Sequence, residues 1–147
     1  MIKHLDILLA DDDIDDCIFF KNALDEILLS TSLTAVHDGE QLMQLLSNES
    51  IELPDILFLD INMPRKNGFE CLAEIKQSAR LKTLLVVVFS TSFEQEVVNS
   101  LYESGAHYFI RKPSAFLQFK KIIQHTLTII MQGNISLPTK DDFVLTV

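Results

Sequence analysis

Five polar residues stand directly after short apolar segments of the chain, and their types could do chemistry together. They are Asp11, Asp12, Asp60, Ser90 and Lys112. Three carboxylates close to one another raise one another's pKa unless a cation shares them. All the ligand atoms on offer are oxygens, which suits a hard ion such as Mg²⁺ better than zinc. Carboxylates with Mg²⁺, a hydroxyl and an ammonium suit phosphoryl chemistry, in which one carboxylate is the nucleophile and the other groups neutralise the phosphoryl oxygens.

These residues can meet only if the apolar segments before them are strands of one sheet. Apolar runs that predict strands occupy residues 5–10, 33–36, 56–59, 84–89 and 107–110. Helical spacing of apolar residues follows each run, first over residues 14–29 and last over residues 114–131. This alternation predicts an α/β fold with a five-stranded parallel sheet and helices on both faces. Ligands of such sheets bind beyond the carboxyl ends of the strands, where the polar residues would converge.

Length, charge and cysteine content narrow the class of protein. A chain of 147 residues fits one domain. Its formal charge of −9, from 21 acidic and 12 basic residues, argues against direct binding to nucleic acid or to an anionic membrane surface. No apolar run approaches the ~20 residues of a membrane span, and the N-terminal segment lacks the pattern of a signal peptide. With two widely separated cysteines, Cys17 and Cys71, these features predict a cytoplasmic protein.

The sequence resembles the receiver domain of response regulators from two-component signalling systems, which has a flavodoxin-like fold of five strand–helix units. The resemblance extends over about residues 3–131 and rests on segments that occur in the family's order and spacing: residues 7–13, 57–64 with Gly68, 86–91, 105–106 and 112–113. Each segment alone is weak, but the set is specific. We expect a receiver domain over residues 1–131 and a tail over residues 132–147, with no output domain.

The resemblance implies a role for each polar residue. Asp60 resembles the phosphoacceptor, which takes a phosphoryl group from a phosphohistidine of a sensor histidine kinase or phosphotransfer protein. Asp12 and Asp60 would bind Mg²⁺ directly, together with the backbone carbonyl of Asn62, and Asp11 would act mainly through a metal-bound water. Lys112 would pair with the phosphoryl group.

Further positions resemble the parts of the family's switch. Ser90 would turn toward the phosphoryl group, and Phe109 would swing inward as Ser90 moves. The bond between Lys112 and Pro113 is expected to be cis, as is typical of the family. Asn62 and Ser92 stand at the positions that often tune the lifetime of the acyl phosphate.

The resemblance predicts a stand-alone response regulator that promotes only its own phosphorylation and dephosphorylation and signals to an unidentified protein target by phosphorylation-dependent contacts. The main alternative is an interaction module of the same fold that is never phosphorylated. Such modules usually lack an acidic-pair residue, the acceptor or the lysine, whereas all of these are present here. A phosphatase of the haloacid-dehalogenase type would carry a second catalytic aspartate two residues after Asp60, where this chain has Asn62.

The acidic run and the last helix leave further expectations. Asp13, Asp15 and Asp16 fit a helix cap and a solvated first turn, without chemistry. The helix over residues 114–131 carries two apolar stripes, one of which includes Ile122 and Ile129. Either the tail folds back over that stripe, or the helix contributes to a partner surface or a homodimer. Residues 143–147 resemble a strand that could add to a sheet edge.

Overall fold

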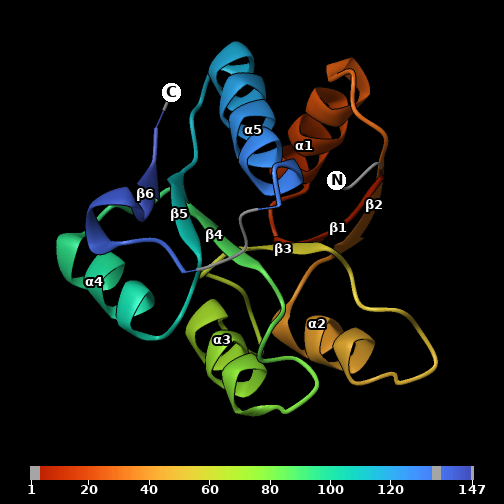
Figure 1. Ribbon diagram of the computed structural model, residues 1–147, viewed down its shortest axis with the longest axis vertical. Helices are drawn as coiled ribbons and strands as arrows, with labels where there is room; N and C mark the ends of the chain where they lie inside the picture. The colour runs from red at the N-terminus through yellow and green to blue at the C-terminus, as the bar shows by residue number, and fades with distance from the viewer. Residues whose placement is uncertain (1–3, 134–136, 147) are drawn as a thin grey trace.

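The computed structural model describes residues 4–133 and 137–146, which form one sheet between two layers of helices (Figure 1). Neighbouring strands are parallel, in the order β2-β1-β3-β4-β5-β6. The strands are β1 (Leu5–Ala10), β2 (Thr31–Val36), β3 (Ile56–Leu59), β4 (Val86–Ser90), β5 (Tyr108–Arg111) and β6 (Val144–Leu145). The helices are α1 (Ile14–Glu26), α2 (Gly39–Leu46), α3 (Gly68–Gln77), α4 (Gln95–Glu103) and α5 (Phe116–Met131), with a short 3-10 helix η1 (Lys140–Asp142). The expected α/β fold is confirmed, and the sheet gains a sixth strand.

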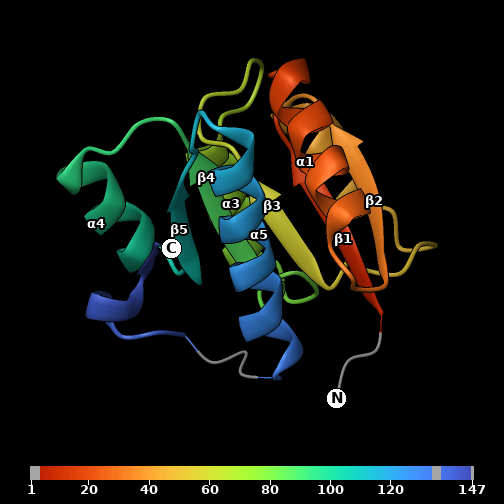
Figure 2. The ribbon, with the colours of Figure 1, turned by 90° about the horizontal axis from the view of Figure 1, so that it is seen from above.

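Helices α1 and α5 cover one face of the sheet and lie side by side (Figure 2). Four phenylalanine rings pack edge to face beneath them: Phe20, Phe58, Phe89 and Phe119. Two of the rings come from β3 and β4, whose residues are all buried, and two come from the helices. Such pairs contribute about 0.5–1.5 kcal/mol each beyond the burial of their area. The cluster therefore anchors both helices to the two central strands.

Helices α2, α3 and α4 cover the opposite face (Figure 1). Each presents buried leucines to the sheet, among them Leu42, Leu72 and Leu101. Asp38 and Asn67 cap the first two of these helices by accepting backbone N–H groups, which sets where each helix begins. Among residues 4–133 and 137–146, none of the helices combines the length and the apolar character that a membrane crossing needs.

The end of the chain is part of the fold, which corrects the five-stranded expectation. Strand β6 pairs in parallel with β5, and the backbone N–H of Phe109 donates to the carbonyl of Phe143 at 3.0 Å. The ring of Phe143 is buried against Tyr102 of α4, with ring centroids 5.3 Å apart. Leu145 packs with the core cluster that includes the second apolar stripe of α5. The tail therefore packs onto the sheet edge and its two flanking cores, which removes apolar side chains from water.

His107 closes the amino-terminal end of the β4–β5 pair with a buried ring. Its backbone N–H donates to the carbonyl of Val86 at 2.8 Å, and its Nδ1 accepts the backbone N–H of Val86 at 3.2 Å. Nδ1 can accept only while it is unprotonated. Burial, helped by the positive charge of Lys76, lowers the pKa of His107 from 6.5 to about 4. The native structure therefore holds this histidine neutral.

We expect the free energy of unfolding to decrease as the pH falls from 6.5 to about 4, because the unfolded chain then binds a proton that folded His107 does not. The decrease amounts to about 3 kcal/mol, and above this range His107 adds no pH dependence. His107→Asn keeps an acceptor for Val86 but does not titrate, so its stability should fall less. Urea unfolding of both proteins across this range measures the difference. If the free energy of unfolding changed equally with pH in both proteins, this role of His107 would be contradicted. The Asp11 carboxyl titrates in both proteins, so it does not affect the comparison.

Candidate functional site

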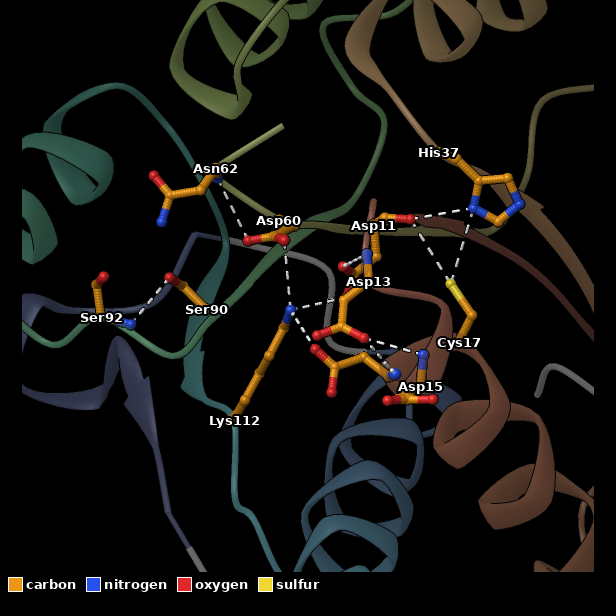
Figure 3. Close-up of polar contacts among 11 residues, drawn as sticks. Asp11, Asp13, Asp15, Cys17, His37, Asp60, Asn62, Ser90, Ser92 and Lys112 are labelled. Atoms are coloured by element: carbon orange, nitrogen blue, oxygen red, sulfur yellow. Dashed lines mark hydrogen bonds and ion pairs between the residues drawn. The ribbon is translucent and has the colours of Figure 1, made fainter. Parts of the chain in front are cut away.

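The carboxyl ends of four strands meet at one edge of the sheet, and the residues singled out from the sequence gather there (Figure 3). Asp11 and Asp12 follow β1, Asp60 follows β3, Ser90 ends β4 and Lys112 follows β5. Because β3 lies between β1 and β4, Asp11 and Ser90 lie on opposite sides of Asp60. Positions more than 100 residues apart in the chain thus share one site, as Lys112 and Asp11 do.

Asp11 is held through its backbone and its side chain. Its N–H donates to the carbonyl of Val36 at 3.0 Å, and its Oδ1 accepts the N–H of Asp13 at 2.9 Å. Its own carbonyl accepts from Nδ1 of His37 at 3.2 Å, which requires the Nδ1–H tautomer, and from the thiol of Cys17 at 3.6 Å. Burial raises the pKa of Cys17 to about 11, so the thiol keeps the proton that it donates. These bonds give Asp11 a defined place at the end of β1.

Asp60 is held in place by the sheet and by the close approach of Gly68 to its backbone. Its N–H donates to the carbonyl of Ala10 at 2.9 Å. A Cβ at Gly68 would lie 2.5 Å from the backbone oxygen of Asp60, closer than atoms can approach. The N–H of Gly68 also donates to the carbonyl of Ile61 at 2.8 Å. Glycine is therefore required where the loop after β3 returns to begin α3.

Lys112 reaches into the carboxylates from the other end of the site. Its Nζ lies 2.7 Å from Oδ2 of Asp11, 2.9 Å from Oδ2 of Asp16 and 3.3 Å from Oδ2 of Asp60. The Lys112 side chain is only 4% exposed, and its Nζ lies 5.5 Å from the centroid of the Phe89 ring. This geometry makes Lys112 the counter-ion of three carboxylates at once.

Burial and charge shift the pKa values of Asp11 and Lys112. Burial raises the pKa of Asp11 from 3.8 to about 7, against the opposing effect of Lys112. Burial also acts to lower the pKa of Lys112, but the charges of Asp60 and Asp11 outweigh it and hold that pKa above its usual value. Lys112 is therefore charged at neutral pH. A metal cation that took the place of the Asp11 proton would stabilise the ionised form of this carboxyl group.

The carboxylates fit a divalent cation. Asp11, Asp12 and Asp60 each offer one oxygen, and these three atoms lie within 4.8 Å of one another. Asp12 is exposed, which leaves the cluster open to solvent on one side. A set of carboxylate oxygens, with room for water, is the kind that Mg²⁺ prefers. These residues therefore fit the metal that the sequence predicts.

Ser90 and Phe109, the residues of the predicted switch, are both buried. Ser90 is fully buried, and its Oγ accepts the backbone N–H of Ser92 at 3.2 Å. The ring of Phe109 is also fully buried, with its centroid 5.8 Å from that of the exposed Phe93 ring. Asn62 is exposed, and its backbone N–H donates to Oδ1 of Asp60 at 3.4 Å. Because Ser90 acts as the acceptor in its bond with Ser92, that bond does not use its hydroxyl hydrogen.

The bond between Lys112 and Pro113 corrects a sequence-based expectation. No cis peptide bond occurs among residues 4–133 and 137–146, so this bond is trans rather than cis. The trans form is lower in energy even before proline. Lys112 also reaches its three carboxylates with the bond in this form.

Asp16 is a site residue that the sequence argument missed. Asp13 is the cap of α1, as expected, and accepts the N–H groups of Asp15 and Asp16. The side chain of Asp16, however, is not merely a solvated part of the first turn, because it forms an ion pair with Lys112. The sequence held one indication of a further role: the run from Asp11 to Asp16 contains more carboxylates than a helix cap and a metal site need.

Comparison with known proteins points to one family. The family model of the response regulator receiver domain matches residues 7–124. Response regulator Rcp1 of Synechocystis sp. is 32% identical over 122 residues, which cover 80% of this chain and 83% of Rcp1.

Solved structures agree with the sequence comparison. The phosphorylated cyanobacterial phytochrome response regulator RcpA superposes with a TM-score of 0.83 at 29% identity, covering 92% of this chain and 99% of RcpA. The Mn²⁺-bound form of Rcp1 gives a TM-score of 0.81 at 29% identity, with the same coverage. The fold, the acidic cluster with its lysine and the family match lead to one conclusion: the chain belongs to the response regulator receiver domain family.

Proposed function

We propose that this response regulator accepts a phosphoryl group on Asp60 in a Mg²⁺-dependent reaction and signals through protein contacts that depend on it. The observation that carries the assignment is how loosely the Asp60 carboxylate is held. From the residues that the structure describes, its oxygens accept two hydrogen bonds, at 3.4 Å from the backbone N–H of Asn62 and at 3.3 Å from Nζ of Lys112. The oxygens of Asp11 accept at 2.9 Å and 2.7 Å, and Asp11 has no exposed surface. Asp60 is therefore the buried carboxylate with lone pairs free to attack phosphorus.

The transfer moves one phosphoryl group between two proteins. An Oδ atom of Asp60 attacks the phosphorus of a phosphohistidine, an O–P bond forms, and the N–P bond breaks as the imidazole leaves and takes up a proton. Lys112 and the Ser90 hydroxyl donate to the phosphoryl oxygens as negative charge gathers on them. Asp11, Asp12, Asp60 and the backbone carbonyl of Asn62 would hold Mg²⁺, which when bound would supply positive charge to offset the negative charge of the phosphoryl group. Water attack on the acyl phosphate later restores Asp60 and releases inorganic phosphate.

The new dianion changes the sheet edge by drawing polar groups toward Asp60. Ser90 turns its hydroxyl to the phosphoryl group, and Phe109, two strands' width from Asp60, adjusts its ring beside Phe93 as Ser90 moves. Asn62 and Ser92, at the positions that often tune the lifetime of the acyl phosphate, influence how long it lasts. The signal thus passes from one carboxylate to the surface formed by β4, β5 and the following helices.

Receiver domains interact with histidine kinases or phosphotransfer proteins and with downstream targets. The phosphodonor of this chain is accordingly a sensor histidine kinase or phosphotransfer protein. The chain promotes its own phosphorylation and dephosphorylation and turns over no separate substrate. A cytoplasmic location, where thiols stay reduced, suits its two free cysteines.

Self-association through α5 and its neighbouring elements remains a prediction of the sequence. Light scattering with and without beryllofluoride, a phosphoryl mimic, measures it. A monomeric mass under both conditions would contradict a homodimer.

The test of the proposed function uses a small phosphodonor. Incubation of the wild-type chain with acetyl phosphate and Mg²⁺, followed by intact mass measurement, should show the gain of one phosphoryl group. A chelator added before acetyl phosphate should prevent the gain. An unchanged mass under all conditions would favour the interaction module that is never phosphorylated.

A further inference from the structure

The ion pair between Asp16 and Lys112 has no part in the proposed chemistry as described so far. An ammonium carries three N–H donors. Lys112 directs these donors to Asp11, Asp16 and Asp60, and the contacts to Asp11 and Asp16 are the two short ones, at 2.7 Å and 2.9 Å. Both distances are typical of charge-assisted hydrogen bonds, whereas the 3.3 Å contact to Asp60 is weaker. The two short contacts use two of the three donors.

Asp16 is well placed to hold an ammonium in one orientation. Its backbone N–H donates to the capping carboxylate of Asp13 at 3.3 Å, so the residue belongs to the ordered first turn of α1. Its side chain is 23% exposed, and its Oδ2 faces Nζ of Lys112. Asp15 lies beside it in the same turn but is exposed, and no described residue forms an ion pair with its carboxylate (Figure 3). The two neighbours have equal charge and different contacts.

We infer that Asp16 is a positioning residue for phosphoryl transfer, which together with Asp11 fixes two N–H donors of Lys112 so that the third is directed at Asp60. This inference rests on the proposed function. A lysine ammonium sits on a flexible stem and rotates freely unless its donors are held. When the O–P bond forms at Asp60, the weak contact to Asp60 gives way to a bond with a phosphoryl oxygen, and the two short contacts stay in place.

Two simpler roles make different predictions. If Asp16 only stabilised the start of α1 through the helix dipole, its removal would lower stability and leave the rate of phosphorylation unchanged. If it acted only through its charge, its removal would speed the transfer, because a site that receives an anion would lose a negative charge. A positioning role predicts a slower transfer, and the loss should depend on Lys112.

The experiment compares initial rates of Asp60 phosphorylation by acetyl phosphate with saturating Mg²⁺, measured by intact mass. Asp16→Ala should lower the rate about tenfold, since a small misplacement of a group that stabilises charge has effects of this order. Asp16→Asn keeps an oxygen that can accept from Lys112, and its rate should lie between those of Asp16→Ala and the wild type. Asp15→Ala removes the same charge from the neighbouring position and should match the wild type.

A double-mutant cycle shows whether Asp16 acts through Lys112. In a Lys112→Ala background, measured with longer incubation, Asp16→Ala and Asp16→Asn should cause no further loss. An Asp16→Ala rate equal to or above that of Asp15→Ala, or an equal loss with and without Lys112, would overturn the inference. Should Asp16→Ala fail to fold, Asp16→Asn decides in the same way. If the wild type itself is not labelled, the proposed function is overturned and the inference falls with it.

Discussion

Asp60→Asn is expected to gain no phosphoryl group under conditions in which the wild-type chain gains one. The amide has no anionic oxygen to attack phosphorus, and Asp11, the other buried carboxylate of the cluster, is not free to take its place. The oxygens of Asp11 are engaged by Asp13 and Lys112, and its side chain is fully buried. Intact mass after incubation with acetyl phosphate and Mg²⁺ measures the result.

The matched control for this substitution is Asp15→Asn, which removes one negative charge near the site from an exposed position. It should be labelled as the wild type is. Equal labelling of the wild type and Asp60→Asn would show that another residue is the acceptor. Loss of labelling in both variants would show that the charge of this edge, and not the nucleophile, limits the reaction.

Phe143→Ala should lower the free energy of unfolding by about 3 kcal/mol, the cost of replacing a buried phenylalanine by alanine. The side chain of Phe143 is 1% exposed and packs against Tyr102, although it lies only a few residues from the end of the chain. Its backbone also joins the tail to β5, since its carbonyl accepts the N–H of Phe109. Urea unfolding followed by circular dichroism measures the change.

Leu137→Ala is the control in the same segment, because this leucine is 60% exposed and its removal should change stability by less than about 0.5 kcal/mol. Amide hydrogen exchange locates the effect: in Phe143→Ala the N–H of Phe109 should lose protection, since its acceptor belongs to the loosened tail. Unchanged stability together with unchanged protection at Phe109 would show that the tail does not contribute to the fold.

Much of the fold could be read from local patterns in the sequence. Buried parallel strands need continuous apolar runs, and β3 and β4 have them. Helix α1 begins where Asp13 caps it, yet it ends at Glu26, before the limit of the apolar pattern over residues 14–29. The pattern continues because Ile27 is also buried, but its backbone is already extended. Periodicity therefore predicted the helix itself, but neither its end nor every buried position, since Leu28 belongs to the same pattern and is 99% exposed.

The candidate site was predictable for a related reason. In a parallel sheet every strand has its carboxyl end at the same edge, so a polar residue directly after an apolar run has a predictable location. Asp60 after β3 and Lys112 after β5 follow this rule. No such rule covers Asp16, which lies inside a helix and reaches Lys112 by the direction of one side chain.

The sequence by itself determined the alternation of strands and helices, the family and the residues at the carboxyl edge of the sheet, because each depends on local composition or on motif order. Only the tertiary structure decided that the tail forms a sixth strand, that the bond before Pro113 is trans and that Asp16 holds Lys112. Residues 143–147 are strand-like in sequence, but nothing local says which edge they join; β6 is a strand because the edge of β5 offers hydrogen bonds. The ion pair of Asp16 and Lys112 also depends on the tertiary structure: the two residues are separated by 96 positions, and packing of α1 against the sheet that contains β5 brings them together.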